Sequence, residues 1–168
     1  ANKIAAVGHA AAQKELTKKL KKKSEFQLNQ VYCTTTGQRE FELPYQNIVA
    51  LNEHASTLHY QNLDRNPPDN FLSFLLDAGA TFNGYASDIT RTISDENNHF
   101  DALIKAMDGL QKKLCSNTKS DVSFVFLNEL AHQLLANVLE EHQLITSKAE
   151  EAYERGITRF FLPHGLGH

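Results

Sequence analysis

The sequence predicts an α+β fold in which helices cover a mainly antiparallel sheet. Helical and strand-like patterns follow one another in the order helix, helix, strands, helix, helix, strand. An Asn83-Gly84 pair between two strand-like runs is the strongest short signal for a hairpin, because both turn positions need positive φ. With 168 residues the chain is long enough for one domain with a real core, so we expect residues 1–168 to form part of one domain.

The first part of the chain predicts two helices and a short strand. Residues 2–22 carry apolar side chains at mostly helical spacings and end in a lysine-rich turn that suits the helix dipole. Ser24 and Gln27 fit a capping box for a second helix, which ends at Gly37. A β-branched run at 47–51 then predicts a strand.

The region after the hairpin predicts two long helices. Residues 99–117 and 122–144 are helical by period, and Ser120 or Asp121 is a plausible cap for the second helix. The stripe that we expect this helix to bury consists of Phe126, Leu130, Leu134, Val138 and Leu139.

The C-terminal part predicts one more helix and a strand. A short charged helix over 148–155 is closed by Gly156, and 157–162 is the last predicted strand. Ala1 opens directly into a helical pattern, and His168 ends the chain with no tail or cap. We therefore expect a piece of a longer protein, truncated at both ends.

The composition is that of an ordinary globular protein, with 41% hydrophobic and 22% charged residues and a net charge of −3. No apolar run approaches the ~20 residues that span a bilayer, so we expect no membrane partner. The mildly acidic balance gives no reason to expect nucleic acid. Cys33 and Cys115 match no metal or redox spacing, and reduced thiols in a cytoplasmic protein are the favoured interpretation over a disulfide.

Two aspartates flank the predicted hairpin. A turn at 83–84 places Asp77 opposite Thr90, so that Asp88 lies on the same face as Asp77 and diagonal to it, roughly 7–8 Å away at Cα. In the mostly apolar setting of Asp77, two carboxylates would repel unless a cation joined them, and two divalent ions would suit the pair. The alternative is that one or both aspartates lie at the sheet edge, facing water or pairing with Arg91.

The histidines fall into two groups. His164 and His168 follow a predicted strand in a Pro- and Gly-containing segment that disfavours a helix, so only one of them need bind metal while the other bonds to substrate or to a ligand. His59 is intermediate, since the apolar flanks at 58 and 60 suit a strand that would carry it towards the same cleft. The ordinary surface or core interpretation is given to His9, His54, His99, His132 and His142.

The segments LLDAGATFNGYASDITRT (75–92) and FFLPHGLGH (160–168) together closely resemble the pita-bread metallopeptidases, and within them the bacterial proline dipeptidases, or prolidases. The segments ANKIAAVGHAAA and LPYQNIVALNEHASTLHY look similar to the same family, so the resemblance covers essentially the whole chain. It implies a partial pita-bread fold, an Xaa-Pro dipeptide as substrate and a homodimer at full length.

The resemblance also implies a metal site. In that family two Asp, one His and two Glu hold two divalent ions, usually manganese in bacterial enzymes. The match assigns Asp77 to one ion, Asp88 to both ions and His168 as the His ligand. Both Glu ligands lie downstream of the HGLGH motif, where this chain ends, so we expect the isolated chain to bind metal weakly and to be inactive.

The resemblance assigns the remaining site residues as well. His59 matches the active-site His that approaches the substrate, and His164 takes a role beside the ligands or facing the substrate. Tyr45 and Leu58 fall where the pocket wall is expected. The implied reaction is attack on the Xaa-Pro carbonyl by a metal-bridged hydroxide, with both histidines donating hydrogen bonds to the tetrahedral intermediate.

Three alternatives stay open. An aminopeptidase P would act on longer peptides in the same fold, and a methionine aminopeptidase would present its metal His in a different glycine context. A non-catalytic peptide-binding module of this fold is a second class, against which the presence of Asp77, Asp88 and His168 argues. The third is a structural α+β domain whose Asp and His residues are incidental.

Overall fold

The computed structural model consists of two compact units, Ala1–Glu96 and Asn97–His168, and each is described by itself. The structure describes residues 1–16, 22–94 and 99–167. Within these ranges, no helix is both long enough and apolar enough to cross a membrane. Cys33 and Cys115 are both free thiols.

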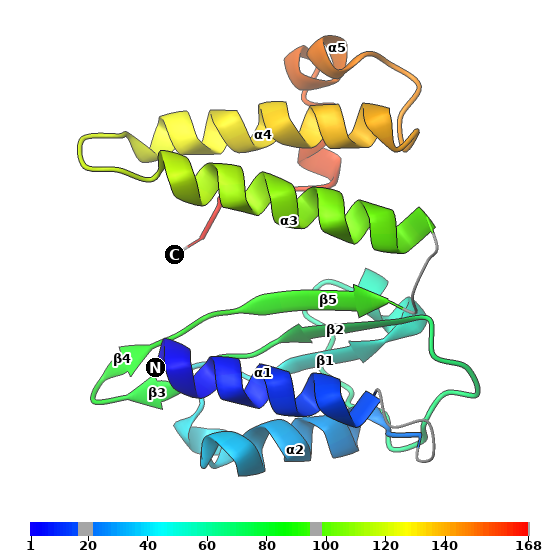
Figure 1. Cartoon of the computed structure of the whole chain (residues 1–168), viewed down its shortest axis with the longest axis vertical. Coiled ribbons are helices and arrows are strands. Elements are labelled where there is room, and N and C mark those ends of the chain that lie inside the picture. The colour runs from blue at the N-terminus through cyan, green and yellow to red at the C-terminus, as the bar shows by residue number, and fades with distance from the viewer. Residues whose placement is uncertain (17–21, 95–98, 168) are drawn as a thin grey trace. The chain divides into compact units, whose positions relative to one another are not determined.

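The first unit packs two helices against a three-stranded antiparallel sheet. The helices are α1 (Asn2–Leu16) and α2 (Glu25–Thr36), and the strands are β1 (Ile48–Leu51), β2 (Ser73–Asp77) and β5 (Thr90–Ser94). The strand order is β1-β2-β5, with β2 in the centre. Figure 1 shows α1 and α2 side by side along one face of this sheet.

Four short elements complete the first unit. A two-stranded hairpin of β3 (Thr81–Phe82) and β4 (Tyr85–Ala86) lies between β2 and β5 in the chain. Two 3-10 turns flank β1, namely η1 (Glu40–Glu42) and η2 (Asn52–Ser56). The segment from η2 to β2 has no regular strand, so the predicted strand around His59 is wrong: residues 57–59 form a bend and a turn instead.

The core of this unit lies between the helices and one face of the sheet. Its fully buried members are Ala12, Leu28, Tyr32, Val49, Leu51, Phe74, Leu76 and Ala78. Because side chains alternate along a strand, Ile48, Ala50, Leu75 and Asp77 project from the opposite face. The Asp77 carboxylate is thereby kept away from the apolar layer and on the side of the sheet that the two helices do not cover.

The second unit is helical. It contains α3 (His99–Asn117), α4 (Phe124–Glu141), α5 (Ala149–Glu154) and the 3-10 turn η3 (Ile157–Phe160). The helices α3 and α5 both pack on α4, and the core consists of Leu110, Leu135, Val138 and Leu139. Behind η3, the buried His132 ring approaches the Thr158 hydroxyl, with 3.0 Å between Nδ1 and Oγ1.

The predicted helix signals of the first unit are confirmed. The Ser24 hydroxyl accepts a hydrogen bond from the Gln27 amide, and the Gln27 side chain accepts one from the Ser24 amide. The helix ends at Gly37, whose φ of 66° is the left-handed conformation that favours glycine. The strand predicted at 47–51 is β1, one residue shorter.

The start and the buried face of α4 differ from the prediction. The cap is Ser123, whose hydroxyl accepts from the Phe126 amide, because Asp121 has φ 68° and belongs to the preceding turn. Val138 and Leu139 are buried as predicted, and the other buried positions are Leu127, Ala131, His132, Leu135 and Ala136. Phe126 is 48% exposed. Apolar side chains occur on two adjacent stripes of this helix, and the stripe with alanines permits the closer helix packing.

The strand predicted at 157–162 is wrong as well. Gly156 has φ 67° and turns the chain into η3, where Phe161 and Leu162 donate backbone hydrogen bonds to the Thr158 carbonyl at 3.1 and 2.9 Å. The β-branched residues favour a strand only beside a partner strand, and in the described part of this unit no strand is present to pair with them.

Candidate metal centre

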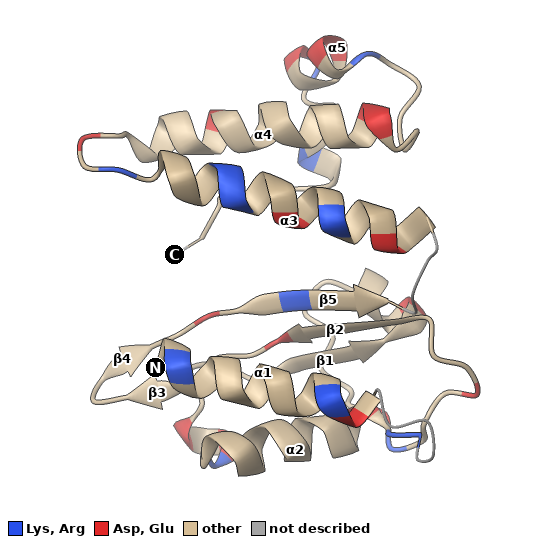
Figure 2. Ribbon diagram, in the orientation of Figure 1, with Lys and Arg blue, Asp and Glu red and all other residues tan. Residues whose placement is uncertain are grey.

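The hairpin register is the one that the sequence predicts. Asp77 pairs with Thr90 across β2 and β5, and the turn residues Asn83 and Gly84 both have positive φ, at 50° and 80°. Figure 2 shows acidic residues at the end of β2 and in the segment that leads into β5, the two places where Asp77 and Asp88 lie. The register therefore brings both carboxylates to neighbouring positions.

A glycine allows the two segments to approach closely. A Cβ atom at position 79 would lie 1.9 Å from the Ser87 carbonyl oxygen, far inside any real contact. Next to this crossing, the Ser87 amide donates to the Ala80 carbonyl at 3.0 Å and the Ser87 hydroxyl accepts from the Ala80 amide at 2.9 Å. Gly79 thus sets the separation between the stretch that follows Asp77 and the stretch that precedes Asp88.

One hydroxyl joins the two carboxylates. The Tyr45 hydroxyl lies 2.7 Å from Asp77 Oδ1 and 2.9 Å from Asp88 Oδ1. A phenol has a single hydrogen, so it can donate to only one of these oxygens at a time, and ionised carboxylates can only accept. The two aspartates therefore share this hydrogen, and one carboxylate oxygen of each faces the same hydroxyl.

The electrostatics of the pair favour a cation. Burial raises the pKa of Asp77, and the negative charge of Asp88 raises it further, while hydrogen bonds from Tyr45 and Thr90 and the nearby His9 act in the opposite direction. Burial also raises the pKa of Tyr45, with both carboxylates adding to the effect, so its hydroxyl stays protonated. A divalent ion with oxygen ligands would relieve this repulsion, so the two carboxylates fit such an ion.

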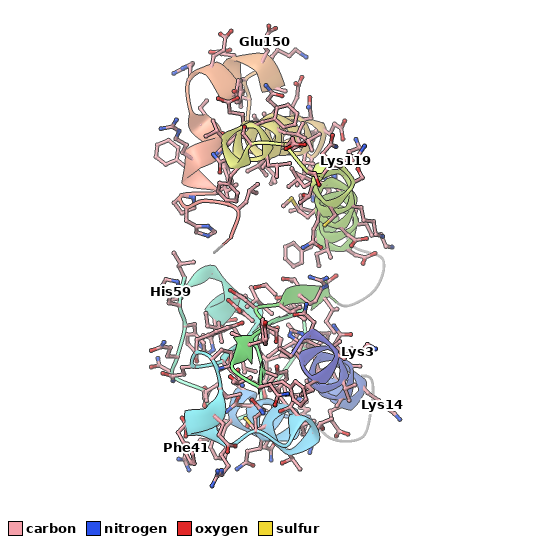
Figure 3. The ribbon with its side chains drawn as sticks, turned by 90° about the vertical axis from the view of Figure 1, so that its left-hand side faces the viewer. Lys3, Lys14, Phe41, His59, Lys119 and Glu150 are labelled. Carbon is pink, nitrogen blue, oxygen red and sulfur yellow. The ribbon has the colours of Figure 1, made fainter. Side chains whose placement is uncertain are left out.

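The turn after η2 carries Leu58 and His59. Leu58 is 63% exposed, and His59 is exposed with φ 57°. Figure 3 shows His59 on an outer loop of the first unit. Both belong to the same unit as the aspartate pair, but no hydrogen bond or ion pair joins them to it in the described part of the chain. Their assignment to the substrate pocket stays a prediction.

Of the two terminal histidines, the structure describes His164, in the second unit. His164 is exposed, and its Nδ1 lies 2.8 Å from the Gly165 carbonyl oxygen. His168 lies outside the described residues. Within the described ranges, no group of three or more His, Cys, Asp or Glu side chains could hold a metal ion. The structure therefore brings together Asp77, Asp88 and Tyr45, and the remaining site residues stay predictions.

Two residues that support Asp77 were not singled out by the sequence. His9 lies 3.1 Å from the Ala78 carbonyl oxygen through Nε2, and Tyr32 donates to the Gly79 carbonyl at 2.9 Å. His9 belongs to α1 and Tyr32 to α2, so both helices contact the backbone directly after Asp77. The signal available in the sequence was His9 beside Gly8 in a run of small residues. The structure explains the glycine, because a Cβ at position 8 would lie 2.6 Å from the Tyr32 ring.

The fold matches solved structures of the expected class. Zinc-substituted aminopeptidase P from E. coli, in complex with product, aligns with a TM-score of 0.83 at 20% identity, over 99% of this chain and 38% of that one. Proline aminopeptidase P II from Yersinia pestis aligns with a TM-score of 0.83 at 24% identity and the same coverage. These matches confirm the α+β class and the partial pita-bread fold.

Sequence comparisons point to the same group. An Xaa-Pro dipeptidase from Serratia proteamaculans is 49% identical over 170 residues, and one from Shewanella amazonensis is 46% identical over 168 residues. Each match covers 100% of this chain, which spans 38% of the length of these relatives. The family model "Metallopeptidase family M24" matches residues 1–168. The resemblance inferred from the two motifs is thereby confirmed, and the chain belongs to metallopeptidase family M24.

Proposed function

We propose that this chain contributes part of the active site of an enzyme that hydrolyses Xaa-Pro dipeptides with two divalent metal ions. We use the term whole-length enzyme for a polypeptide that contains this chain and is as long as its dipeptidase relatives. The observation that carries the proposal is the pair of carboxylate oxygens, from Asp77 and Asp88, that converge on the Tyr45 hydroxyl. Relatives that are named Xaa-Pro dipeptidase and are 46–49% identical support the choice of substrate.

Asp77, Asp88 and His168 are the residues of this chain that would hold the metal. Divalent ions there would polarise the scissile carbonyl and lower the pKa of a bound water. Asp77 lies at the end of the central strand β2, whose backbone pairs with β1 on one side and with β5 on the other, and hydrogen bonds from Tyr45 and Thr90 orient its carboxylate. Asp88 is more exposed and would face the incoming ligand.

The other proposed site residues act on the substrate. The Tyr45 hydroxyl, held protonated, orients the two carboxylates and forms part of the pocket wall. Leu58 offers an exposed apolar side chain for the substrate, and His59 and His164 offer ring N–H groups for the carbonyl oxygen as it gains charge. A Glu beyond this chain would move the proton between water and the leaving amine.

The chain by itself carries three of the five side chains that the resemblance implies. We propose that, in isolation, it binds metal weakly and turns over little or no dipeptide. Manganese as the preferred metal, a homodimer and a cytoplasmic location remain proposals that rest on the resemblance.

The direct test is hydrolysis of an Xaa-Pro dipeptide by the whole-length enzyme, before and after chelation and re-addition of Mn²⁺. Asp77→Asn and Asp88→Asn should each lower kcat/KM more than about 100-fold, since a direct ligand matters more than the supporting residues around it. Asp69→Asn is the matched control, because Asp69 is exposed on a loop away from the pair. Full activity of either ligand variant, or of the metal-free enzyme, would contradict the proposal.

The same assay separates the alternatives. An aminopeptidase P-like enzyme would cleave Xaa-Pro-Yaa tripeptides in preference to dipeptides. A non-catalytic module would bind peptides without cleaving them, and its peptide binding would not depend on Asp77 or Asp88.

A further inference from the structure

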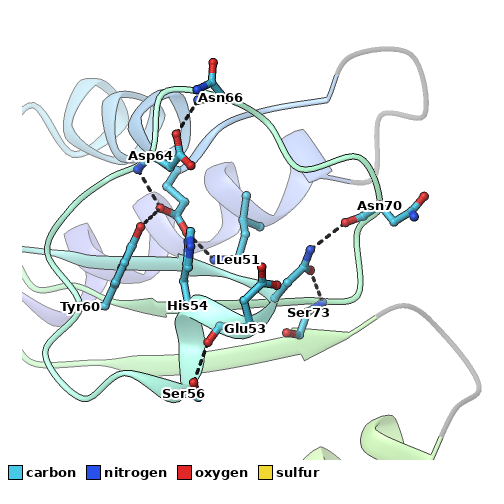
Figure 4. Close-up of polar contacts among 11 residues, drawn as sticks. Leu51, Glu53, His54, Ser56, Tyr60, Asp64, Asn66, Asn70 and Ser73 are labelled. Carbon is cyan, nitrogen blue, oxygen red and sulfur yellow. Dashed lines mark hydrogen bonds and ion pairs between the residues drawn. The ribbon is translucent and has the colours of Figure 1, made fainter.

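Glu25 is a buried carboxylate with four hydrogen-bond donors, all from one segment of the chain. Its side chain is 1% exposed. Oε1 accepts from the Leu51 amide at 2.8 Å and from His54 Nδ1 at 2.8 Å. Oε2 accepts from the Tyr60 hydroxyl at 2.7 Å and from the Asp64 amide at 2.8 Å. Figure 4 shows these contacts around the loop between β1 and β2.

The start of α2 does not require this carboxylate. The capping box is complete with Ser24 and Gln27, whose side chains each accept the hydrogen bond of the other's amide. Burying a charged group costs free energy unless the group is fully hydrogen-bonded, so a buried carboxylate without such partners would destabilise this unit. The four acceptor sites of Glu25 are instead directed to residues 51–64, and the Phe26 amide adds a hydrogen bond to the Asp64 carbonyl at 3.1 Å.

The segment held by Glu25 has an unusual backbone. Asn52, His59 and Leu63 have φ values of 53°, 57° and 49°, in the left-handed region that residues with a Cβ rarely adopt. Such conformations persist when the surrounding contacts determine them. The donors Leu51 and His54 lie before His59, and Tyr60 and Asp64 follow it, so the carboxylate fixes the turn on both sides.

A second anchor holds the same segment at its start. The Asn52 side chain donates to the Asn70 carbonyl at 2.8 Å and accepts from the Ser73 amide at 3.2 Å (Figure 4). It also accepts from the Leu72 amide at 2.8 Å. The His54 ring stacks on the Tyr60 ring with 4.7 Å between centroids and 20° between planes. The base of the loop is therefore rigid, whereas its tip, with Leu58 63% exposed, is not held by packing.

We infer that Glu25 is a positioning residue: its carboxylate holds the turn that presents Leu58 and His59 to the substrate. The inference rests on the proposed function, in which these two residues contact the dipeptide. Glu25 itself touches neither metal nor substrate. Its influence on the reaction passes through the backbone of residues 54–64.

The test is a double-mutant cycle in the whole-length enzyme. Glu25→Gln keeps the size of the side chain but turns one acceptor into a donor that faces two other donors. We expect kcat/KM for an Xaa-Pro dipeptide to fall about tenfold, with a higher KM because Leu58 is displaced and a lower kcat because His59 is displaced, and with Mn²⁺ affinity unchanged. In a background that carries Leu58→Ala and His59→Ala, Glu25→Gln should cause no further loss, because it acts through those side chains.

A matched control and a milder variant make the test decisive. Glu53→Gln removes the same charge from an exposed residue of the same loop and should leave KM unchanged. If Glu25→Gln does not fold, Tyr60→Phe removes one of the four donors while it keeps the ring, and a smaller rise in KM is expected in the same cycle.

The outcomes separate this inference from the proposed function. Loss of folded enzyme alone would lower the apparent kcat and leave KM unchanged, and that result, or full additivity in the cycle, would overturn the positioning role. A parent enzyme that does not cleave Xaa-Pro dipeptides would overturn the proposed function instead. Amide hydrogen exchange at 52–64, which should be faster in Glu25→Gln than in the parent, would still report whether the carboxylate holds the loop.

Discussion

Replacing Gly79 by alanine should disturb the metal centre without touching a proposed ligand. The new Cβ would lie 1.9 Å from the Ser87 carbonyl oxygen, and the Pro44 ring, 2.8 Å away, blocks escape in that direction. Real Cβ contacts essentially never fall below 3.0 Å, so the two segments must separate by about 1 Å. Asp77 lies two residues before Gly79, and Asp88 directly follows Ser87, so the two aspartates must move apart as well.

The expected magnitudes follow from that displacement. Overpacking of this kind costs ~1–3 kcal/mol, and each hydrogen bond lost between Ala80 and Ser87 adds ~1 kcal/mol. The three bonds between these residues are 3.0, 2.9 and 3.2 Å long, and an extra ~1 Å puts them beyond hydrogen-bond range. A misplacement of about 1 Å in a catalytic group can cost on the order of 100-fold in rate, so we expect kcat/KM to fall by about that factor.

Three measurements on the whole-length enzyme check this chain of reasoning: urea unfolding, Mn²⁺ binding by calorimetry, and kcat/KM for an Xaa-Pro dipeptide. Gly109→Ala is the control, because no atom lies within 4 Å of its added Cβ and it sits inside α3. That variant should gain ~0.5–1 kcal/mol of stability and keep its activity. Parent-like metal affinity and kcat/KM in Gly79→Ala would refute the argument.

Three further predictions concern the whole-length enzyme. Ser24→Ala removes the cap of α2 and should lower the free energy of unfolding by ~1 kcal/mol in urea titrations. Burial lowers the pKa of His132 below its usual 6.5, and the positive charge of Arg159 adds to this, so the unfolded state binds the proton more tightly. Stability that is present above pH 6.5 should decline as the pH falls below it, and His132→Asn should flatten that decline. Tyr45→Phe removes the donor shared by the aspartates and should destabilise the metal-free enzyme by about 1–3 kcal/mol. Mn²⁺ compensates the same charges, so it should raise Tm more in this variant than in the parent, and a smaller rise would contradict the shared-donor interpretation.

The hairpin is a feature that could be predicted from residues close together in the sequence. A two-residue turn with positive φ at both positions fixes the register, and the register fixes which residues share a face. Asp77 and Thr90 could therefore be paired from the sequence, and Ser24 and Gly37 could be read as helix signals, because each depends only on residues a few positions apart.

The remaining features depend on partners that are distant in the chain. Nothing near Gly79 indicates that the Ser87 carbonyl will lie against it, and nothing near Tyr45 indicates that its hydroxyl reaches both aspartates. The buried face of α4 was predicted only in part, for a related reason. Val138 and Leu139 are buried as expected, but the helix has two adjacent apolar stripes, and only the packing of α3 and α5 decides which is buried. The 157–162 segment has strand-forming residues but no strand beside it in the described part of its unit.

Glu25, Asp77 and Asp88 are all acidic side chains, yet the surroundings of their carboxylate oxygens differ in whether they favour a bound metal ion. Glu25 receives two donors on each oxygen, which fills the roughly four acceptor sites of a carboxylate and leaves no lone pair for an ion. Asp77 and Asp88 instead direct one oxygen each to the single Tyr45 hydrogen, and burial and mutual repulsion raise the pKa of Asp77. Two carboxylates that face one point repel each other, and a cation placed there relieves the repulsion, which is why we assign the metal to the aspartates and a positioning role to Glu25.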